Sequence, residues 1–147
     1  MKTKFILLFN ILFFSLLICG DKKENPDVKI KPILKKTSIS QCKDFFVEFN
    51  FITKDGIEIK LEPEMEFEID SNNIIEMLEK VEIPKKKTHL DVSKNVKKFF
   101  KVKCDAPIGK HIIKGTCTYF YCSKKESWCS RFTYPFEINL EVVKKIK

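Results

Sequence analysis

The residues with the clearest chemical potential in this chain of 147 residues are its six cysteines. One of them, Cys19, directly follows an apolar N-terminal segment. The other five are spread over the sequence that follows: Cys42, Cys104, Cys117, Cys122 and Cys129. If Cys19 is modified, an odd number of thiols remains, and at least one of them has no intramolecular partner. The count does not say which cysteines pair, so the pairing must be argued from local geometry.

Cys122 and Cys129 are the pair with the strongest geometric argument. The six residues between them form an even spacer, so a hairpin centred on Lys125-Glu126 places Cys122 directly opposite Cys129. Opposed residues of an antiparallel pair have Cα atoms about 4.5–5.5 Å apart. This separation lies within the range of about 4.4–6.8 Å that disulfides accept. We therefore predict a Cys122–Cys129 disulfide.

Loop size separates two roles for the cysteines. A Cys122–Cys129 bridge stabilises the fold by about 2.5 kcal/mol in the chain-entropy model, whereas a Cys42–Cys104 bridge closes about 63 residues and contributes about 4.3 kcal/mol. We interpret Cys42 and Cys104 as a structural disulfide. The short pair is the candidate for redox chemistry, because breaking it costs the fold less. Cys117 lies on the face opposite Cys122 of the same predicted strand, where we expect a free cysteine buried in the core.

The side chains around the short pair favour a redox role. Lys124, Lys125 and Arg131 would stabilise a thiolate at either sulfur and lower its pKa. Trp128 would either shield the bridge or form part of a docking surface. The alternative is that the short bridge is only a structural staple of its hairpin.

The N-terminus has the layout of a signal peptide. Lys2 and Lys4 form a charged start, and the run 5–18 is apolar apart from Asn10 and Ser15. A basic segment followed by an apolar core of this length is typical of secretory signals. At about 14 residues the run is shorter than the roughly 20 that a membrane-spanning helix needs.

The end of this signal indicates lipidation. The sequence Leu16-Leu17-Ile18-Cys19 resembles a bacterial lipobox, although Ile18 stands where that motif usually has Gly, Ala or Ser. We expect acylation of Cys19 and a membrane-anchored lipoprotein of the cell envelope, facing the periplasm or the cell exterior. An uncleaved membrane anchor and ordinary secretion are the alternatives. The predicted division is a signal peptide over 1–18, a lipidated tether over 19–30 and one domain over 31–147.

The formal net charge of +8 does not point to nucleic acid, because the chain is expected to be exported and its charges are segregated. Acids dominate residues 55–82, and bases dominate residues 85–103. Two solvated faces of a β-domain explain this pattern. The alternative is a dipolar surface that steers a charged partner or lies against anionic lipid. His89 and His111 are too few and too scattered for a metal site or a hydrolase triad, so we expect no metal and no cofactor.

Alternation of apolar and polar residues with a period of two is the main structural signal. The strands that it predicts lie at 45–51, 57–61, 65–69, 100–104, 111–122 and 132–143. Asp55-Gly56 is typical of a hairpin turn. The segment 71–80 is the one stretch that could form a helix, and the lysine-rich segment 85–98 is expected to be a long loop or cap. This pattern predicts an all-β fold, an immunoglobulin-like antiparallel β-sandwich of about seven strands.

A resemblance to a known family rests on short motifs in the C-terminal part of the chain. They are Ala106-Pro107-Ile108-Gly109-Lys110-His111, Gly115, Tyr119-Phe120-Tyr121-Cys122 and Trp128-Cys129. Over about residues 99–140 the chain resembles the N-terminal periplasmic domain of the DsbD family. The resemblance implies an immunoglobulin-like sandwich that passes electrons through a cysteine pair on one hairpin. It also implies catalytic roles for Cys122 and Cys129, and a thioredoxin-like or other periplasmic redox protein as partner.

Two functional hypotheses follow. In the first, Cys122 and Cys129 cycle between dithiol and disulfide, and the domain is a thiol–disulfide exchange module. In the second, the chain is a non-catalytic β-sandwich lipoprotein that binds a protein or surface partner, and its disulfides are only structural.

Overall fold

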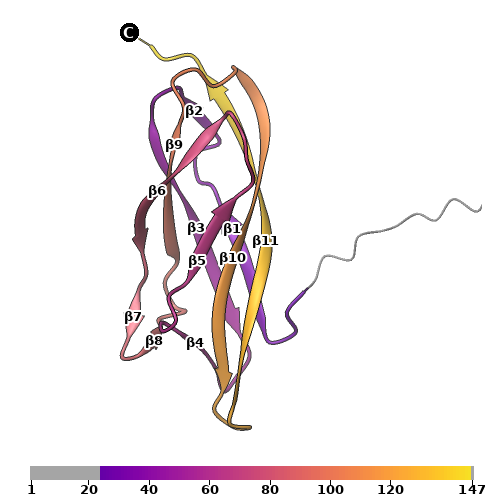
Figure 1. Ribbon diagram of the computed structural model, residues 1–147. Helices are drawn as coiled ribbons and strands as arrows, with labels where there is room; N and C mark the ends of the chain where they lie inside the picture. Colours follow the sequence, from indigo (N-terminus) through magenta and orange to yellow (C-terminus); the bar gives the residue numbers. More distant parts are fainter. Residues whose placement is uncertain (1–23, 147) are drawn as a thin grey trace, which may run out of the picture.

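The computed structural model describes residues 24–146, and every element of regular secondary structure in this range is a β-strand (Figure 1). The strands in chain order are β1 (Val28–Ile33), β2 (Ser38–Ser40), β3 (Asp44–Thr53), β4 (Ile57–Lys60), β5 (Glu66–Ile69), β6 (Ile75–Glu82), β7 (Lys85–Lys86), β8 (His89–Leu90), β9 (Val96–Val102), β10 (Gly109–Ser123) and β11 (Trp128–Val143). In the described range no helix is long and apolar enough to cross a membrane. The expected signal peptide and its Cys19 lie outside the described residues.

The strands form two sheets with immunoglobulin-like topology. The first sheet has the order β1-β3-β9-β6, and the second has the order β2-β11-β10-β4-β8-β7, with β5 also paired to β10. If β4 and β5 are counted as one broken strand, the principal strands reproduce the A-B-E-D and C-F-G sheets of that fold. The predicted β-sandwich is therefore confirmed. Five of its strands lie outside the predicted set: β1, β6 and the three short strands β2, β7 and β8, of which β2 pairs in parallel with β11.

The core lies between the two sheets and follows the alternation of the sequence. In β3 the buried apolar side chains are those of Phe45, Val47, Phe49 and Phe51, and in β11 they are those of Phe136, Ile138, Leu140 and Val142. Phe49 joins the layers, because its ring centroid lies 5.0 Å from those of both Phe67 on β5 and Phe136 on β11. The inward positions that the period-two pattern predicted for these two strands are confirmed.

Gly115 of β10 permits the close approach of β5 to β10. A Cβ atom at this position would lie 2.6 Å from Cζ of Phe136 and closer still to the carbonyl oxygen of Glu68. Because one of these neighbours is backbone, it could not move aside without disturbing the β5–β10 ladder. A side chain at this position would therefore push β5 away from β10.

The Asp55-Gly56 turn is present, but the predicted hairpin is wrong. Gly56 has a φ of 79°, and the Ile57 N–H donates to the Lys54 carbonyl across the turn at 3.1 Å. The strands on either side belong to different sheets, because β3 pairs with β1 and β9 whereas β4 pairs with β10 and β8. The turn therefore carries the chain from one layer to the other.

The helix considered for residues 71–80 is also wrong. The Asn72 side chain accepts hydrogen bonds from the N–H groups of Ile74 and Ile75, at 2.9 and 2.8 Å, as a helix cap would. The chain then extends as β6 along β9, with a register shift between Met77 and Val81. Pairing with the edge of a buried strand satisfies the backbone N–H and C=O groups of this segment better than a short helix with few apolar residues would.

The lysine-rich segment 85–98 is not a single loop. It contains the β7–β8 hairpin, which pairs with β4, and the first residues of β9. Leu90 anchors the hairpin because its side chain is buried in the core.

The sandwich begins earlier than the expected boundary at residue 31. Strand β1 starts at Val28, and Asn25 before it is buried. The side-chain amide of Asn25 donates to the hydroxyl of Tyr119 at 3.0 Å, and its side-chain carbonyl oxygen accepts from the backbone N–H of Asp27 at 2.9 Å. Residues 25–30, which we expected in the tether, are therefore part of the folded domain.

Candidate functional site

The Cys122–Cys129 disulfide lies at the end of the β10–β11 hairpin, the longest among residues 24–146. Strands β10 and β11 pair along all of β10, and this register places Cys122 opposite Cys129, with Cα atoms 4.0 Å apart. The pairing is the one that the even spacer predicted. The next pair, Ser123 and Trp128, closes the ladder before the turn. Figure 1 shows this turn at the end of the sandwich opposite to β2.

The two cysteines of this bridge differ in exposure. Cys122 is buried, with 8% of its surface exposed, because β10 is covered by strands on both sides. Cys129 on β11 is exposed. The bridge is therefore open to solvent from the Cys129 side, a distinction that sequence spacing could not make.

An ionised carboxylate lies beside Cys122. Glu58 on β4 is the residue directly opposite Cys122, so the two side chains share the outer face of the second sheet. Glu58 forms ion pairs with Lys124 and with Lys60 at 3.3 Å, and its carboxylate lies 3.4 Å from Nδ1 of His89. The hydrogen bond from Lys124 is the main cause that holds the pKa of Glu58 below its usual value, against the opposing effect of burial. Sequence reasoning assigned the acids of this region to a solvent face and missed Glu58.

The basic residues that we expected around the bridge are paired with neighbouring acids. Lys124 pairs with Glu58, and Lys125 pairs with Asp55 at 2.6 Å. Arg131 lies 3.6 Å from Glu66 on β5. All three bases that we expected to stabilise a thiolate are therefore engaged by carboxylates. These acids come from strands β4 and β5 and from the turn before β4, which pairing with β10 brings beside the hairpin.

Trp128 does not cover the bridge. Because it neighbours Cys129 in an extended strand, its side chain points to the opposite face of the sheet. There its ring packs edge-on against Tyr121, with centroids 5.5 Å apart, and its indole N–H donates to Glu126 at 2.7 Å. Trp128 therefore anchors the hairpin to the core side, and the shielding role proposed for it is wrong.

Cys42 and Cys104 form the second disulfide, with Cα atoms 4.4 Å apart. The bridge joins the turn between β2 and β3 to the turn after β9, so Cys104 lies beyond the strand that we expected to contain it. Two hydrogen bonds join the same turns. The Val102 N–H donates to the Lys43 carbonyl at 2.9 Å, and the Gln41 amide donates to the Ala106 carbonyl at 2.8 Å. This bridge therefore reinforces a contact between turns that are distant in sequence.

Cys117 is the free cysteine of the described residues. It points into the core from β10 with no exposed surface, and burial strongly raises the pKa of its thiol. A thiol without solvent access and without an accessible thiolate is inert towards exchange. The core position predicted for Cys117 is confirmed.

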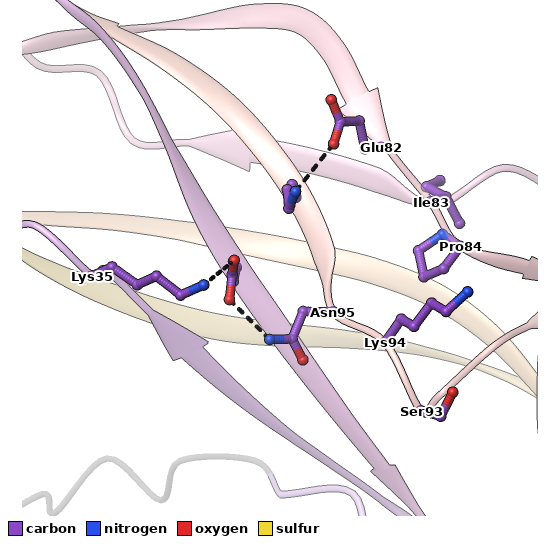
Figure 2. A pocket seen from close by; sticks show the side chains of 9 residues that line it. Lys35, Glu82, Ile83, Pro84, Ser93, Lys94 and Asn95 are labelled. Atoms are coloured by element: carbon purple, nitrogen blue, oxygen red, sulfur yellow. Dashed lines mark hydrogen bonds and ion pairs between the residues drawn. The ribbon is translucent and has the colours of Figure 1, made fainter.

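A separate polar pocket of about 680 Å³ lies on the outer face of the first sheet (Figure 2). Its buried acid, Glu48, accepts hydrogen bonds from Lys35 at 2.8 Å and from Asn95 at 2.9 Å. At its rim Lys97 lies 3.5 Å from Glu82. Lys35, Glu48, Lys97 and Glu82 are thus engaged by partners within the pocket, and the hydrogen bonds of Glu48 tie β3 to the segments around it.

Comparisons with known proteins assign no family. No protein-family model and no curated protein matches the chain. A crystal structure of the yeast GGA1 GAE domain aligns with a TM-score of 0.38 and 12% sequence identity, over 78% of this chain and 95% of that chain. Likeness at this level assigns neither a relationship nor a function.

Proposed function

We propose that the domain is a thiol–disulfide exchange module that acts through Cys122 and Cys129. The observation that carries the proposal is the asymmetry of the bridge, whose exposed Cys129 is joined to a buried Cys122 at the end of a hairpin. Strands β10 and β11 remain paired over the rest of their length, so opening the bridge leaves the ladder in place. The second disulfide lies in turns at the other end of the sandwich and is independent of this step (Figure 1).

The exchange begins at the exposed cysteine. A partner thiolate attacks Sγ of Cys129, a mixed disulfide forms, and the Cys122–Cys129 bond breaks with its electron pair on Sγ of Cys122, which then takes up a proton. A second thiolate of the partner attacks the mixed disulfide and releases Cys129. The partner dithiol is thereby oxidised to a disulfide and the hairpin is reduced by two electrons. The same steps in reverse carry two electrons from the reduced hairpin to a partner disulfide.

The charge beside Cys122 favours electron transfer from the reduced hairpin to its partner. Glu58 is ionised next to the position where a Cys122 thiolate would form, and nearby negative charge disfavours a thiolate. Strongly oxidising pairs are those whose reduced form is stabilised. This pair lacks such stabilisation because carboxylates engage the bases around it, so we assign the reduced hairpin the role of electron donor to a periplasmic or surface redox partner.

The proposed setting is the cell envelope. Two disulfides are typical of proteins of an oxidising, extracytoplasmic compartment. Acylation at Cys19 would hold the domain at a membrane through a short tether, since the folded domain already includes Asn25. Palmitate labelling of the wild-type chain and of Cys19→Ser tests the anchor, and labelling that persists in the variant would disprove it.

Equilibration of the protein with glutathione or dithiothreitol buffers, followed by mass mapping of the bridges, tests the exchange function. We expect the Cys122–Cys129 bridge to be reduced first, with a potential above about −300 mV, the region below which structural disulfides lie. A value below that limit would assign the bridge to structure alone.

The second candidate function is a non-catalytic binding domain with two structural disulfides. The observation that favours it is the pairing of Lys124, Lys125 and Arg131 with carboxylates, which leaves no cation reserved for a thiolate. In this case the Cys122→Ser/Cys129→Ser variant would still bind its partner. Under the exchange function the double variant loses all electron transfer while the fold remains.

A further inference from the structure

A row of five residues crosses the second sheet beside the disulfide. Its members face one another in the strand registers of β11, β10, β4, β8 and β7, and in that order they are Arg131, Phe120, Lys60, His89 and Lys86. Opposed residues of adjacent strands share a face. The row therefore forms one continuous strip, which we call the basic row.

The basic row lies on the outer face. The neighbours of its members along each strand point inward, as Tyr119, Ile59 and Leu90 show by being buried at 2% exposure or less. The Arg131 side chain is 58% exposed, that of Lys60 is 32% exposed, and Lys86 is exposed at the end of β7. The row thus presents cations to solvent on both sides of a half-buried Phe120.

The basic row also borders the reactive cysteine. Arg131 and Phe120 are each two residues along the strand from Cys129 and Cys122, on the same face, which corresponds to about 7 Å. Lys85 and Lys87 continue the positive charge at the β7–β8 hairpin, where both are exposed. Glu58 and Glu66 offset part of this charge, and the cations still outnumber them.

We propose that the basic row is the docking surface for the exchange partner, and that this partner is a redox protein with acidic residues around its reactive cysteine. The inference rests on the exchange function proposed above and names the chemistry of its partner. Complementary charge orients the encounter and raises its rate, and Phe120 supplies an apolar contact at the centre. The segregated lysines of the sequence thereby acquire a role that composition alone did not define.

Reduction of the oxidised protein by three synthetic peptides tests the proposal. Each peptide carries one cysteine, flanked by aspartates, by serines or by lysines, and each rate is divided by the thiolate fraction of that peptide. At low ionic strength we expect the aspartate peptide to react about tenfold faster than the serine peptide. The ratio should approach one at high salt, where exposed charges are screened.

Charge-reversal variants locate the effect. Lys86→Glu/Arg131→Glu should abolish the preference for the aspartate peptide. Lys29→Glu/Lys31→Glu, the matched change on exposed residues of β1 in the other sheet, should retain it. If the first variant fails to fold, Lys86→Gln/Arg131→Gln replaces it. A preference that survives in the row variants, equal rates for all peptides, or faster reaction with the lysine peptide overturns the docking proposal.

The outcomes separate this proposal from the exchange function. If no peptide reduces the bridge under conditions that reduce small model disulfides, the exchange function itself fails. If all peptides reduce it equally, exchange stands and docking through the basic row fails. Binding to vesicles of anionic phospholipid that is lost in Lys86→Glu/Arg131→Glu, without any peptide preference, would assign the row to a membrane surface and overturn the partner proposed here.

Discussion

Glu58 lies directly opposite Cys122 across the ladder between β4 and β10, on the face of the sheet that carries the disulfide. Cys122 therefore has a sulfur partner on one side, Cys129, and a carboxylate on the other. The carboxylate is kept ionised by Lys124 and Lys60. We expect this carboxylate to influence how readily a reduced Cys122 becomes a thiolate.

Glu58→Gln should lower the pKa of the reduced Cys122 thiol. The substitution removes a negative charge next to the sulfur and releases two lysines that it had engaged, so we expect a decrease of about one unit. The thiolate absorbance of Cys129→Ser, titrated with and without Glu58→Gln, measures this pKa directly. Glu68→Gln on β5 is the matched control, because Glu68 faces Thr116 and lies far along the strand from Cys122. An unchanged pKa would show that Glu58 does not act on the sulfur.

The two disulfides should differ in their contributions to stability. Their sequence separations are 62 and 7 residues. Cys42→Ser/Cys104→Ser should therefore lose about 4 kcal/mol of unfolding free energy and Cys122→Ser/Cys129→Ser about 2.5 kcal/mol in the chain-entropy model. Urea unfolding of the two double variants measures the difference. Equal losses, or a larger loss for the short pair, would contradict a specialised structural role for Cys42–Cys104.

Glu48 should make stability depend on pH below its ordinary pKa of 4.5. Hydrogen bonds from Lys35 and Asn95 lower the pKa of this carboxyl, whose side chain is 6% exposed. A lowered folded-state pKa contributes stability that is present above the ordinary value and is lost as pH falls through the lower one. Glu48→Gln should be about 1 kcal/mol less stable than wild type at pH 7, and the difference should disappear under more acidic conditions.

Denaturant unfolding at several pH values measures this effect. Glu64→Gln is the control, because Glu64 is exposed in the segment before β5. A stability difference for Glu48→Gln that stays constant from neutral to acidic pH would rule out the carboxylate as its cause.

The hydrogen bond between Asn25 and Tyr119 should couple the N-terminal segment to the core. Asn25→Ala leaves the largely buried hydroxyl of Tyr119 without its partner, and we expect a loss of about 1–2 kcal/mol. Tyr119→Phe removes that hydroxyl, so adding Asn25→Ala to it should cost less than in the wild type. Unfolding of both single variants and the double variant completes the cycle. Additive losses would show that the bond contributes no coupling.

Several features could be predicted from the sequence because their causes are local. The alternation in β3 and β11 predicts their buried faces, since successive side chains of a strand point to opposite sides. The even spacer between Cys122 and Cys129 predicts their opposition, because a tight hairpin sets its own register. The core position of Cys117 follows from its parity relative to Cys122.

The remaining features depend on contacts between distant segments. The Asp55-Gly56 turn has the local chemistry of a hairpin, yet the pairing preferences of β3 and β4 for different partners make it a crossing between sheets. The segment 71–80 has a cap and some helical spacing, yet it forms strand β6 because it pairs with the edge of β9. Local propensity cannot anticipate either outcome, because the competing interaction lies elsewhere in the chain.

The sequence by itself determined the all-β class of this protein, the facing pair Cys122 and Cys129 and the buried Cys117, since each follows from spacing within one or two strands. Tertiary structure alone decided which carboxylates engage the bases of the hairpin and which cysteine is exposed. It also decided that Arg131 and Lys86, 45 residues apart, lie in one row across the sheet. The physical reason is that β-pairing brings together side chains from remote segments, and their charges then act at distances that the order of residues does not encode.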